Sequence, residues 1–237
     1  MKAIILAAGR GNRMGVLTKD LPKCRTVFKG KELIQWQIES LRGAGIDDIA
    51  IVRGYLADTF DLNVKYFDNK RWAETNMVIS LISANEWLKN DICISSYSDI
   101  IYSSDAVKRL VSAPGDITIT YDPNWEELWK LRFEDPLSDA ETFRMCGGFI
   151  SEIGERATSI DEIEGQYMGL VKYTKRGWKE VSNYLMQIEK YELDRMDITT
   201  LLKGLILSGI RVNAIPIKDK WYEIDSESDL KKYLVND

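Results

Sequence analysis

The chain has 237 residues, carries a formal net charge of −5 and contains no histidine. Its length suits one medium-sized α/β domain, and 45% hydrophobic residues is ordinary for a globular protein. The negative charge offers no broad basic face for nucleic acid. Without histidine, the chain lacks the usual general base, the usual zinc ligand and any His-containing catalytic triad. Its chemistry must rely on carboxylates, Lys, Arg and metal ions.

Three widely spaced cysteines, Cys24, Cys93 and Cys146, form no CxxC pair. We therefore expect no disulfide framework, which is typical of a reducing compartment. The apolar run at residues 2–7 is far too short to span a bilayer and leads directly into charged residues. We expect a cytoplasmic protein without a membrane segment. The sequence leaves open whether the chain forms a homo-oligomer.

The predicted elements alternate between strands and helices along the first half of the chain. Residues 2–7 form a continuous apolar run that ends in small residues, which is typical of a buried parallel strand. Helical spacing follows from Leu33 to Leu41 and stops at a Gly-Ala-Gly turn. The repeated order predicts right-handed crossovers and a mainly parallel sheet. The further predicted elements here are strands at 49–52, 64–67, 92–94 and 117–121, a helix at 76–88, and a helix at 104–111 capped by Ser104 or Asp105.

Between residues 122 and 166 the regular pattern weakens, and Trp, Asp, Glu and Pro become frequent. We interpret 122–166 as a small substrate-facing insertion with its own strands, near Phe143 and at 149–153. The pattern then returns, with strands at 167–173, 212–217 and 221–224 and helices at 177–191, 197–207 and 226–234. Ser226 is the expected N-cap of the last helix, with Asp229 at the capping-box position. No repeat or linker interrupts the chain, so we expect residues 1–237 to form a single domain.

A glycine-rich loop at residues 9–15 follows the first strand. Glycines let a backbone approach phosphate oxygens closely and adopt dihedral angles closed to other residues. The spacing differs from a dinucleotide fingerprint, whose third glycine would come one residue earlier, and from a P-loop, which would end in Gly-Lys-Ser/Thr. Instead, Arg13 lies in the loop and Pro22 stiffens the backbone before Lys23. Two cations around a glycine loop predict a triphosphate site.

Two aspartates each follow a predicted strand. Asp99 comes after 92–94 and Asp225 after 221–224, at the edge where ligand sites gather in open α/β sheets. A lone aspartate after a strand is more often a helix N-cap. Two carboxylates at neighbouring strand ends could nevertheless share a hard cation, because Mg²⁺ is usually held by one or two carboxylates plus substrate phosphates. We predict that Asp99 and Asp225 hold Mg²⁺.

The whole set of motifs resembles the signature of the sugar-phosphate and choline-phosphate nucleotidyltransferases. The resemblance rests on residues 4–14 with Pro22-Lys23, and on 74–77, 96–100, 134–142, 165–170 and 223–225. The later motifs are more similar to bacterial phosphocholine, 2-aminoethylphosphonate and phosphoglutamine cytidylyltransferases. This resemblance implies a Rossmann-like, GT-A-type mixed sheet, mainly parallel and flanked by helices. It also implies a reaction that joins CMP from CTP to a small phosphorylated or phosphonylated acceptor and releases pyrophosphate.

The resemblance also implies roles for individual residues. Arg13 and Lys23 would bind the phosphates and act in catalysis, while Asp99 and Asp225 would hold Mg²⁺. The base would lie against Ala8 and its neighbours. The full set of expected nucleotide-binding residues is Leu6, Ala7, Ala8, Gly9, Gly11, Arg13, Lys23, Asn76 and Ser98.

The acceptor side is expected in or beside the insertion, where Trp129, Asp139, Glu164 and Tyr167 combine aromatic faces with carboxylates. Such a combination suits an ammonium group. Glu164 stands where related enzymes are expected to carry a neutral amide, which predicts a more acidic pocket. In the alternative interpretation, the aromatic residues are core and the carboxylates are solvated surface. The pattern does not choose among phosphocholine, aminoethylphosphonate and phosphoglutamine.

Two other functions stay open at this level. One is a sugar-1-phosphate nucleotidyltransferase that uses UTP, GTP or dTTP. The other is a non-catalytic nucleotide-binding regulatory subunit, which would be expected to have lost Lys23, Asp99 or Asp225. All three residues are present.

Overall fold

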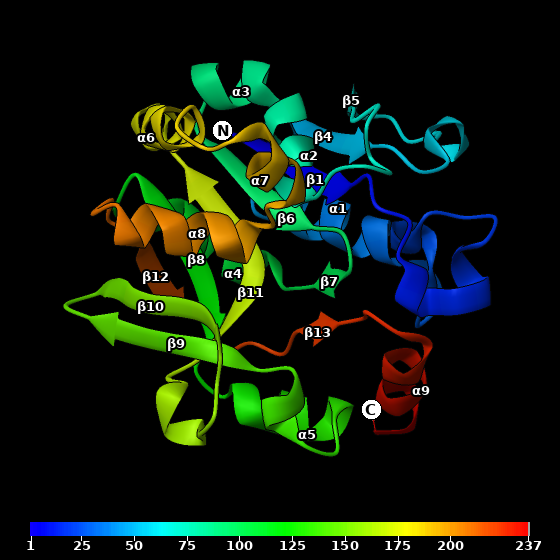
Figure 1. Ribbon diagram of the computed structural model, residues 1–237. Coiled ribbons are helices and arrows are strands. Elements are labelled where there is room, and N and C mark those ends of the chain that lie inside the picture. The colour runs from blue at the N-terminus through cyan, green and yellow to red at the C-terminus, as the bar shows by residue number, and fades with distance from the viewer. Residues whose placement is uncertain (237) are drawn as a thin grey trace.

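The computed structural model describes residues 1–236, in which a nine-stranded sheet runs through the molecule (Figure 1). The strand order is β5-β4-β1-β6-β11-β8-β12-β10-β9. Strands β10 and β11 run against the other seven, which confirms a mixed and mainly parallel sheet. Its strands are β1 (Lys2–Ala7), β4 (Ile49–Arg53), β5 (Lys65–Asp68), β6 (Cys93–Tyr97), β8 (Ile117–Asp122), β9 (Glu141–Cys146), β10 (Phe149–Arg156), β11 (Gln166–Tyr173) and β12 (Asn213–Pro216).

Helices cover both faces of this sheet, because successive side chains of a strand point to opposite sides. In β1, Ala3 and Ile5 pack into one core, whereas Ile4 and Leu6 pack into the other. The first core is covered by α1 (Leu33–Gly43), α4 (Ser104–Ser112) and α5 (Trp125–Arg132). The second is covered by α2 (Met77–Ser83), α3 (Asn85–Asn90), α6 (Lys175–Leu185) and α8 (Ile198–Leu207), and Figure 1 shows α8 crossing in front of β8.

Several predicted boundaries are wrong for local reasons. The helix predicted at 76–88 is two helices, because the backbone leaves helical geometry at Ala84, with φ −94° and ψ 18°. The helix predicted at 177–191 ends at Leu185, and α7 (Lys190–Arg195) is separate. The cap of α4 is Ser103, whose Oγ accepts a hydrogen bond from Ala106 N at 3.0 Å. Apolar spacing continues across the two helix breaks, at Ala84 and after Leu185, so periodicity alone does not reveal them.

The segment 122–166 contains the predicted strands as the β9–β10 hairpin, and also the helix α5, which the sequence patterns did not predict. Trp125 and Trp129 of α5 are buried in the first core. Strand β10 pairs with β12, so the hairpin continues the central sheet at its edge. The segment is therefore attached to the same sheet that carries the glycine-rich loop.

The structure also contains two short ribbons, one of which brings distant parts of the chain together. Strand β7 (Ile100–Ile101) pairs antiparallel with β13 (Tyr222–Glu223), and Ile224 N donates to Asp99 O at 2.8 Å. The second ribbon joins β2 (Val27–Phe28) to β3 (Lys31–Glu32). The β7–β13 ribbon places the residue after β6 beside the residues after β13, where the last helix α9 (Glu227–Asn236) begins.

Within the described part of the chain, no helix combines the length and apolar character that crossing a bilayer requires. The cysteines Cys24, Cys93 and Cys146 are free thiols in the structure.

Candidate active site

The candidate active site centres on the ammonium group of Lys23. Lys23 begins the 3-10 helix η2 (Lys23–Arg25) directly after Pro22, and its side chain is buried. Its Nζ donates to Asp99 Oδ2 at 2.7 Å and to Asp225 Oδ1 at 2.5 Å. Burial alone would lower the pKa of Lys23, but the two carboxylates outweigh burial and raise the pKa. The structure thus brings together three of the residues predicted from separate motifs.

The backbone of Gly11 makes room for the Lys23 side chain. Gly11 has a φ of +70°, and a Cβ placed on it would lie 2.7 Å from Lys23 Cβ. Thr18 Oγ1 holds the same turn by donating to Gly11 O at 3.1 Å. The glycine-rich loop therefore packs directly on the methylene stem of Lys23, and this close approach needs glycine.

The substitution Gly11→Ala is expected to lower kcat about 10-fold or more, because the added methyl displaces Lys23 from its two carboxylates. It should also destabilise the fold by about 1–2 kcal/mol through backbone strain. Gly15→Ala is the matched control, since Gly15 also has a positive φ but open space at its Cβ position. Turnover and thermal unfolding of both variants check this, and equal losses of kcat would contradict the role given to Gly11.

The two aspartates leave one carboxylate oxygen without a partner, and a second pairs only with an exposed cation. Asp99 Oδ1 is buried without a hydrogen-bond partner, and Asp225 Oδ2 forms an ion pair with the exposed guanidinium of Arg13. In residues 1–236, no three His, Cys, Asp or Glu side chains form a cluster suited to a metal ion. Mg²⁺ does not require such a cluster, because it keeps waters and phosphate oxygens as ligands. The donor set fits Mg²⁺ bound together with a nucleotide.

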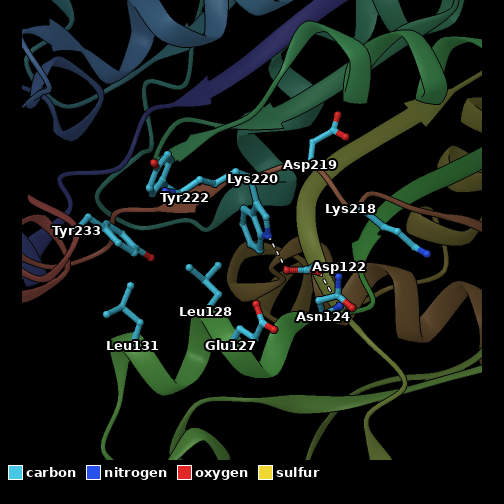
Figure 2. A pocket seen from close by; sticks show the side chains of 11 residues that line it. Asp122, Asn124, Glu127, Leu128, Leu131, Lys218, Asp219, Lys220, Tyr222 and Tyr233 are labelled. Atoms are coloured by element: carbon cyan, nitrogen blue, oxygen red, sulfur yellow. Dashed lines mark hydrogen bonds between the residues drawn. The ribbon is translucent and has the colours of Figure 1, made fainter. Parts of the chain in front are cut away.

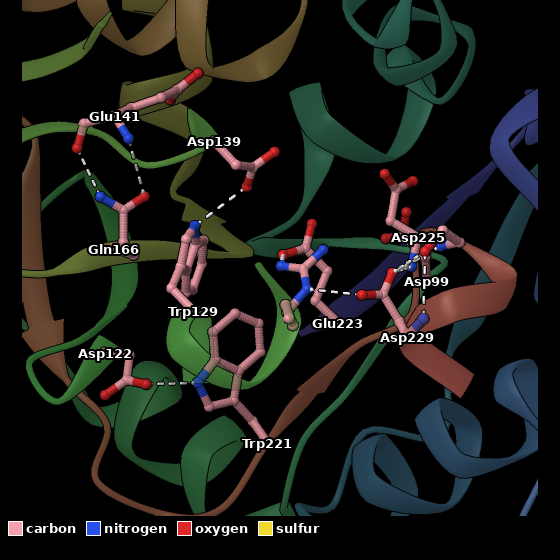
Figure 3. Close-up of polar contacts among 12 residues, drawn as sticks. Asp99, Asp122, Trp129, Asp139, Glu141, Gln166, Trp221, Glu223, Asp225 and Asp229 are labelled. Atoms are coloured by element: carbon pink, nitrogen blue, oxygen red, sulfur yellow. Dashed lines mark hydrogen bonds and ion pairs between the residues drawn. The ribbon is translucent and has the colours of Figure 1, made fainter. Parts of the chain in front are cut away.

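A buried ionic network holds the segment that carries Asp225 (Figure 3), and sequence patterns did not reveal it. Arg132, at the end of α5, forms an ion pair with Glu223 and donates from Nε to Asp229 Oδ1 at 3.2 Å. Asp229 Oδ2 in turn accepts from Asp225 N at 3.1 Å and Ser226 N at 2.8 Å. Burial raises the pKa of Glu223 to about 7, because it outweighs the opposite effect of the Arg132 guanidinium. The Ser226–Asp229 capping box is confirmed, since Asp229 N donates to Ser226 Oγ at 3.2 Å.

This network makes Asp229 a positioning residue for Asp225. Asp229→Ala is expected to raise the Mg²⁺ concentration needed for half-maximal activity several-fold, because the Asp225 backbone loses its acceptor. It should also lower stability by roughly 1–3 kcal/mol, because Arg132 Nε and two backbone N–H groups lose their acceptor while Arg132 keeps its ion pair with Glu223. Ser226→Ala is the control, because it removes the helix cap, worth about 1 kcal/mol, and keeps the Asp229–Asp225 hydrogen bond. If the two variants require the same Mg²⁺ concentration, Asp229 only caps α9 and does not position Asp225.

Residues 6–9, the first of those expected to bind the nucleotide, lie at or just after the carboxyl end of β1. Leu6, Ala7 and Ala8 are buried, and Gly9 is exposed with open space around its Cβ position. Ala8 O accepts from Tyr55 N at 2.9 Å.

An aromatic pair, Tyr55 and Trp72, lies beside the glycine-rich loop, and the sequence patterns did not predict it. Tyr55 packs edge-on against Trp72 with a centroid distance of 5.3 Å, and the Arg10 guanidinium lies 5.5 Å from the centroid of the Tyr55 ring. Both rings come from loops with no regular apolar spacing, so no periodic signal marked them.

Asn76 and Ser98 lie on two further segments. Asn76 caps α2, with Oδ1 accepting from Met77 N at 2.8 Å and Nδ2 donating to Arg195 O at 3.0 Å. A nucleotide contact from Asn76 would compete with these two bonds. Ser98 is half-buried and directly precedes Asp99.

The structure brings together some of the predicted acceptor residues. Trp129 is buried, and its Nε1 donates to Asp139 Oδ2 at 3.1 Å. The Tyr167 ring packs on Tyr97 with a centroid distance of 5.6 Å, and its hydroxyl group is buried without a hydrogen-bond partner. Among the described residues, the hydrogen bonds of the Glu164 carboxylate reach Met145 N of β9, at 2.8 Å, and not Trp129 or Asp139.

A cavity of about 400 Å³ lies between α5, the 218–222 segment and α9 (Figure 2). Trp221 forms part of its wall and donates from Nε1 to Asp122 Oδ2 at 2.8 Å. The lining does not include Lys23, Asp99 or Asp225. This cavity is therefore separate from the candidate active site.

Comparison with known proteins agrees with the geometry. Residues 3–134 match the MobA-like NTP transferase domain. The chain is 39% identical to the CTP:phosphoglutamine cytidylyltransferase of Campylobacter jejuni over 98% of each chain. Among solved structures, the inositol-1-phosphate CTP transferase from T. maritima has a TM-score of 0.76 at 20% identity, covering 96% of this chain and 90% of that one.

The CTP:phosphocholine cytidylyltransferase of Streptococcus pneumoniae shares the fold with a TM-score of 0.73 at 23% identity, covering 98% of this chain and 96% of that one. These matches confirm the resemblance and the GT-A-like sheet. The chain is therefore a nucleotidyltransferase that belongs to the MobA-like NTP transferase family.

Proposed function

We propose that this enzyme transfers CMP from CTP to a small phosphorylated acceptor that carries an amino group. The observation that supports it best is the Lys23 ammonium, which is buried beneath the glycine-rich loop and shared by Asp99 and Asp225. The 39% identity to a phosphoglutamine cytidylyltransferase favours a phosphorylated glutamine as the acceptor.

In the proposed reaction, an oxygen of the acceptor phosphate attacks the α-phosphorus of CTP. A new P–O bond forms, the bond to the β-phosphate oxygen breaks, and pyrophosphate leaves with the electron pair. A phosphate monoester has a second pKa of about 6, so the nucleophile is already an anion near neutral pH. No general base is required, which agrees with a chain that has no histidine. Positioning and charge neutralisation then account for the catalysis.

The cationic side chains supply the charge neutralisation. Lys23 and Arg13 both pair with Asp225 in the structure, and the phosphates of CTP would compete for the same donors. Asp99 and Asp225 would hold Mg²⁺, which would neutralise triphosphate charge when bound. The expected base side of the site is the small-residue turn at Ala8 and Gly9, with Asn76 and Ser98 on neighbouring segments.

The acceptor would lie between this phosphate site and the β9–β10 hairpin. Asp139 is exposed and is oriented by the indole of Trp129, so its carboxylate is available to an ammonium group. Tyr167 contributes an unpartnered hydroxyl near the end of β6. Glu164 borders the same region from the β9 side.

Pyrophosphate release, measured with CTP, UTP, GTP and dTTP against a panel of acceptors, tests the proposal. The panel contains phosphoglutamine, phosphocholine, 2-aminoethylphosphonate, ethylphosphonate and several sugar 1-phosphates. We expect CTP with an amino acceptor to be preferred tens-fold or more in kcat/KM, the discrimination that a charge-assisted contact supports. A preference for a sugar 1-phosphate with another NTP would establish the rival sugar nucleotidyltransferase instead.

A further inference from the structure

A cavity of about 380 Å³ lies next to Asp139, between residues 137–141 and residues 154–156 of β10. In Figure 3, Asp139 lies between Glu141 and the Asp99–Asp225 pair, and the cavity lining includes Asp139 and Glu141 but neither Asp99 nor Asp225. Its lining has charges of both signs. The lining residues are Leu137, Ser138, Asp139, Ala140, Glu141, Gly154, Glu155 and Arg156.

The β9–β10 hairpin contains two Glu/Arg pairs in direct cross-strand register. The outer pair, Arg144 opposite Glu152, forms an ion pair with an N–O distance of 3.6 Å. The inner pair, Glu141 opposite Arg156, borders the cavity. Directly opposed residues have Cβ atoms about 5 Å apart, which is well within reach of both side chains.

In the described residues, Glu141 and Arg156 of the inner pair nevertheless form no ion pair with each other. Across residues 1–236, no ion pair or side-chain hydrogen bond joins the exposed guanidinium of Arg156 to another group. The neighbouring Glu155 pairs with Lys203 of α8 instead. The hairpin thus pairs its outer charges internally, whereas among the described residues the Glu141 carboxyl group and the Arg156 guanidinium have no ion-pair partner at the cavity.

The Glu141 carboxylate is in an environment that favours a cation. It is half-buried, and burial, together with Asp197 and Asp139, raises the pKa of Glu141 to about 7. A positively charged ligand would remove the repulsion among these carboxylates. Arg156 offers a planar set of donors suited to a carboxylate, on the opposite strand.

We propose that this cavity binds the zwitterionic head of an α-amino acid, with the ammonium group at Glu141 and Asp139 and the carboxylate at Arg156. The inference rests on the proposed CMP transfer, which places the acceptor phosphate at Lys23. It restricts the acceptor to amino acids phosphorylated on the side chain. Phosphocholine and 2-aminoethylphosphonate have no carboxylate for Arg156, and a quaternary ammonium group has no N–H to donate to Glu141.

Three acceptors and CTP test the proposal through kcat/KM for pyrophosphate release. They are side-chain phosphoglutamine, its analogue without the α-carboxylate, and its analogue without the α-amino group. The wild-type enzyme should prefer phosphoglutamine over each analogue by roughly 10- to 100-fold, the range for one charge-assisted contact. Arg156→Met should abolish only the preference over the decarboxylated analogue, with Arg156→Lys restoring part of it. Glu141→Gln, or Asp139→Asn, should reduce only the preference over the deaminated analogue.

The outer pair of the same hairpin provides matched controls. Arg144→Met and Glu152→Gln remove one charge of the same sign each from the same hairpin, outside the cavity, and should keep both preferences. Equal losses for all three acceptors in Arg156→Met and Arg156→Lys would overturn the proposal. Wild-type turnover of phosphocholine or aminoethylphosphonate that matches phosphoglutamine would also overturn it, while leaving CMP transfer intact. If CTP reacts with no acceptor at all, the proposed function itself is contradicted.

Discussion

Replacing Asp225 or Asp99 with asparagine is expected to lower kcat by about 10³-fold or more while the enzyme stays folded. Each carboxylate would hold Mg²⁺ and also anchors the Lys23 ammonium, at 2.5 Å from Asp225 and 2.7 Å from Asp99. Bound metal is worth several kcal/mol of transition-state charge stabilisation, and each 1.4 kcal/mol is a factor of ten. Initial rates over a range of Mg²⁺ concentrations, with thermal unfolding of each variant, measure the effect.

Asp219→Asn controls for the loss of one negative charge. Asp219 forms an ion pair with Arg109 and borders the separate cavity, so this variant should keep wild-type turnover. EDTA should stop the native enzyme, and added Mg²⁺ should restart it. Full activity in EDTA, or in folded Asp99→Asn or Asp225→Asn, is incompatible with the two-carboxylate metal site.

Lys23→Met is expected to lower kcat by about 10²-fold or more and to raise the KM for CTP by a smaller factor. A preorganised cation acts most strongly on charge that develops in the transition state. Removing one such donor therefore lowers kcat by a factor of this size. Methionine nearly preserves the volume of the stem that packs under Gly11. Steady-state kinetics with varied CTP separates the two parameters.

A second measurement on the same variant tests the geometry around Lys23. Without the ammonium, Asp99 and Asp225 lose the cation that lies between them, so Mg²⁺ should raise the Tm of Lys23→Met more than that of the wild type. Lys19→Met, at an exposed position of the same loop region, serves as the charge control. Unchanged kcat with weaker CTP binding would mean that Lys23 only docks the nucleotide.

The part of the site predicted from sequence comes from signals that are local in the chain. Arg13 and Lys23 stand out in a glycine-rich loop after an apolar strand, and Asp99 and Asp225 each follow a strand. The rule that ligand sites gather at strand ends places these residues on one side of the sheet. The rule does not reveal the β7–β13 ribbon, because its two-residue strands are too short for any periodic pattern. This ribbon nevertheless brings the two aspartates into contact with one lysine.

The missed residues depend on packing between distant segments. Arg132 belongs to α5, an eight-residue helix rich in Trp and Glu, and only the fold brings it to Glu223 and Asp229. Sequence patterns predicted Asp139, which lines the cavity, and Glu164, whose carboxylate hydrogen-bonds to Met145 N instead. They did not single out Glu141 and Arg156, which line the cavity with Asp139. That distinction depends on which face of a strand each side chain occupies next to a hairpin turn, and register in the irregular 122–166 segment could not be set without the β9–β10 pairing.

The central claim, transfer of CMP from CTP to the phosphate of an amino-bearing acceptor, has one direct test. The enzyme is incubated with CTP, Mg²⁺ and phosphoglutamine whose phosphate oxygens carry ¹⁸O, and the products are analysed by ³¹P NMR and mass spectrometry. If the acceptor oxygen attacks the α-phosphorus, stoichiometric unlabelled pyrophosphate forms, and the CMP-linked product retains every acceptor ¹⁸O, including the bridging oxygen. Pyrophosphate or free CMP formed equally well without the acceptor, or label lost to solvent, would contradict the proposed transfer.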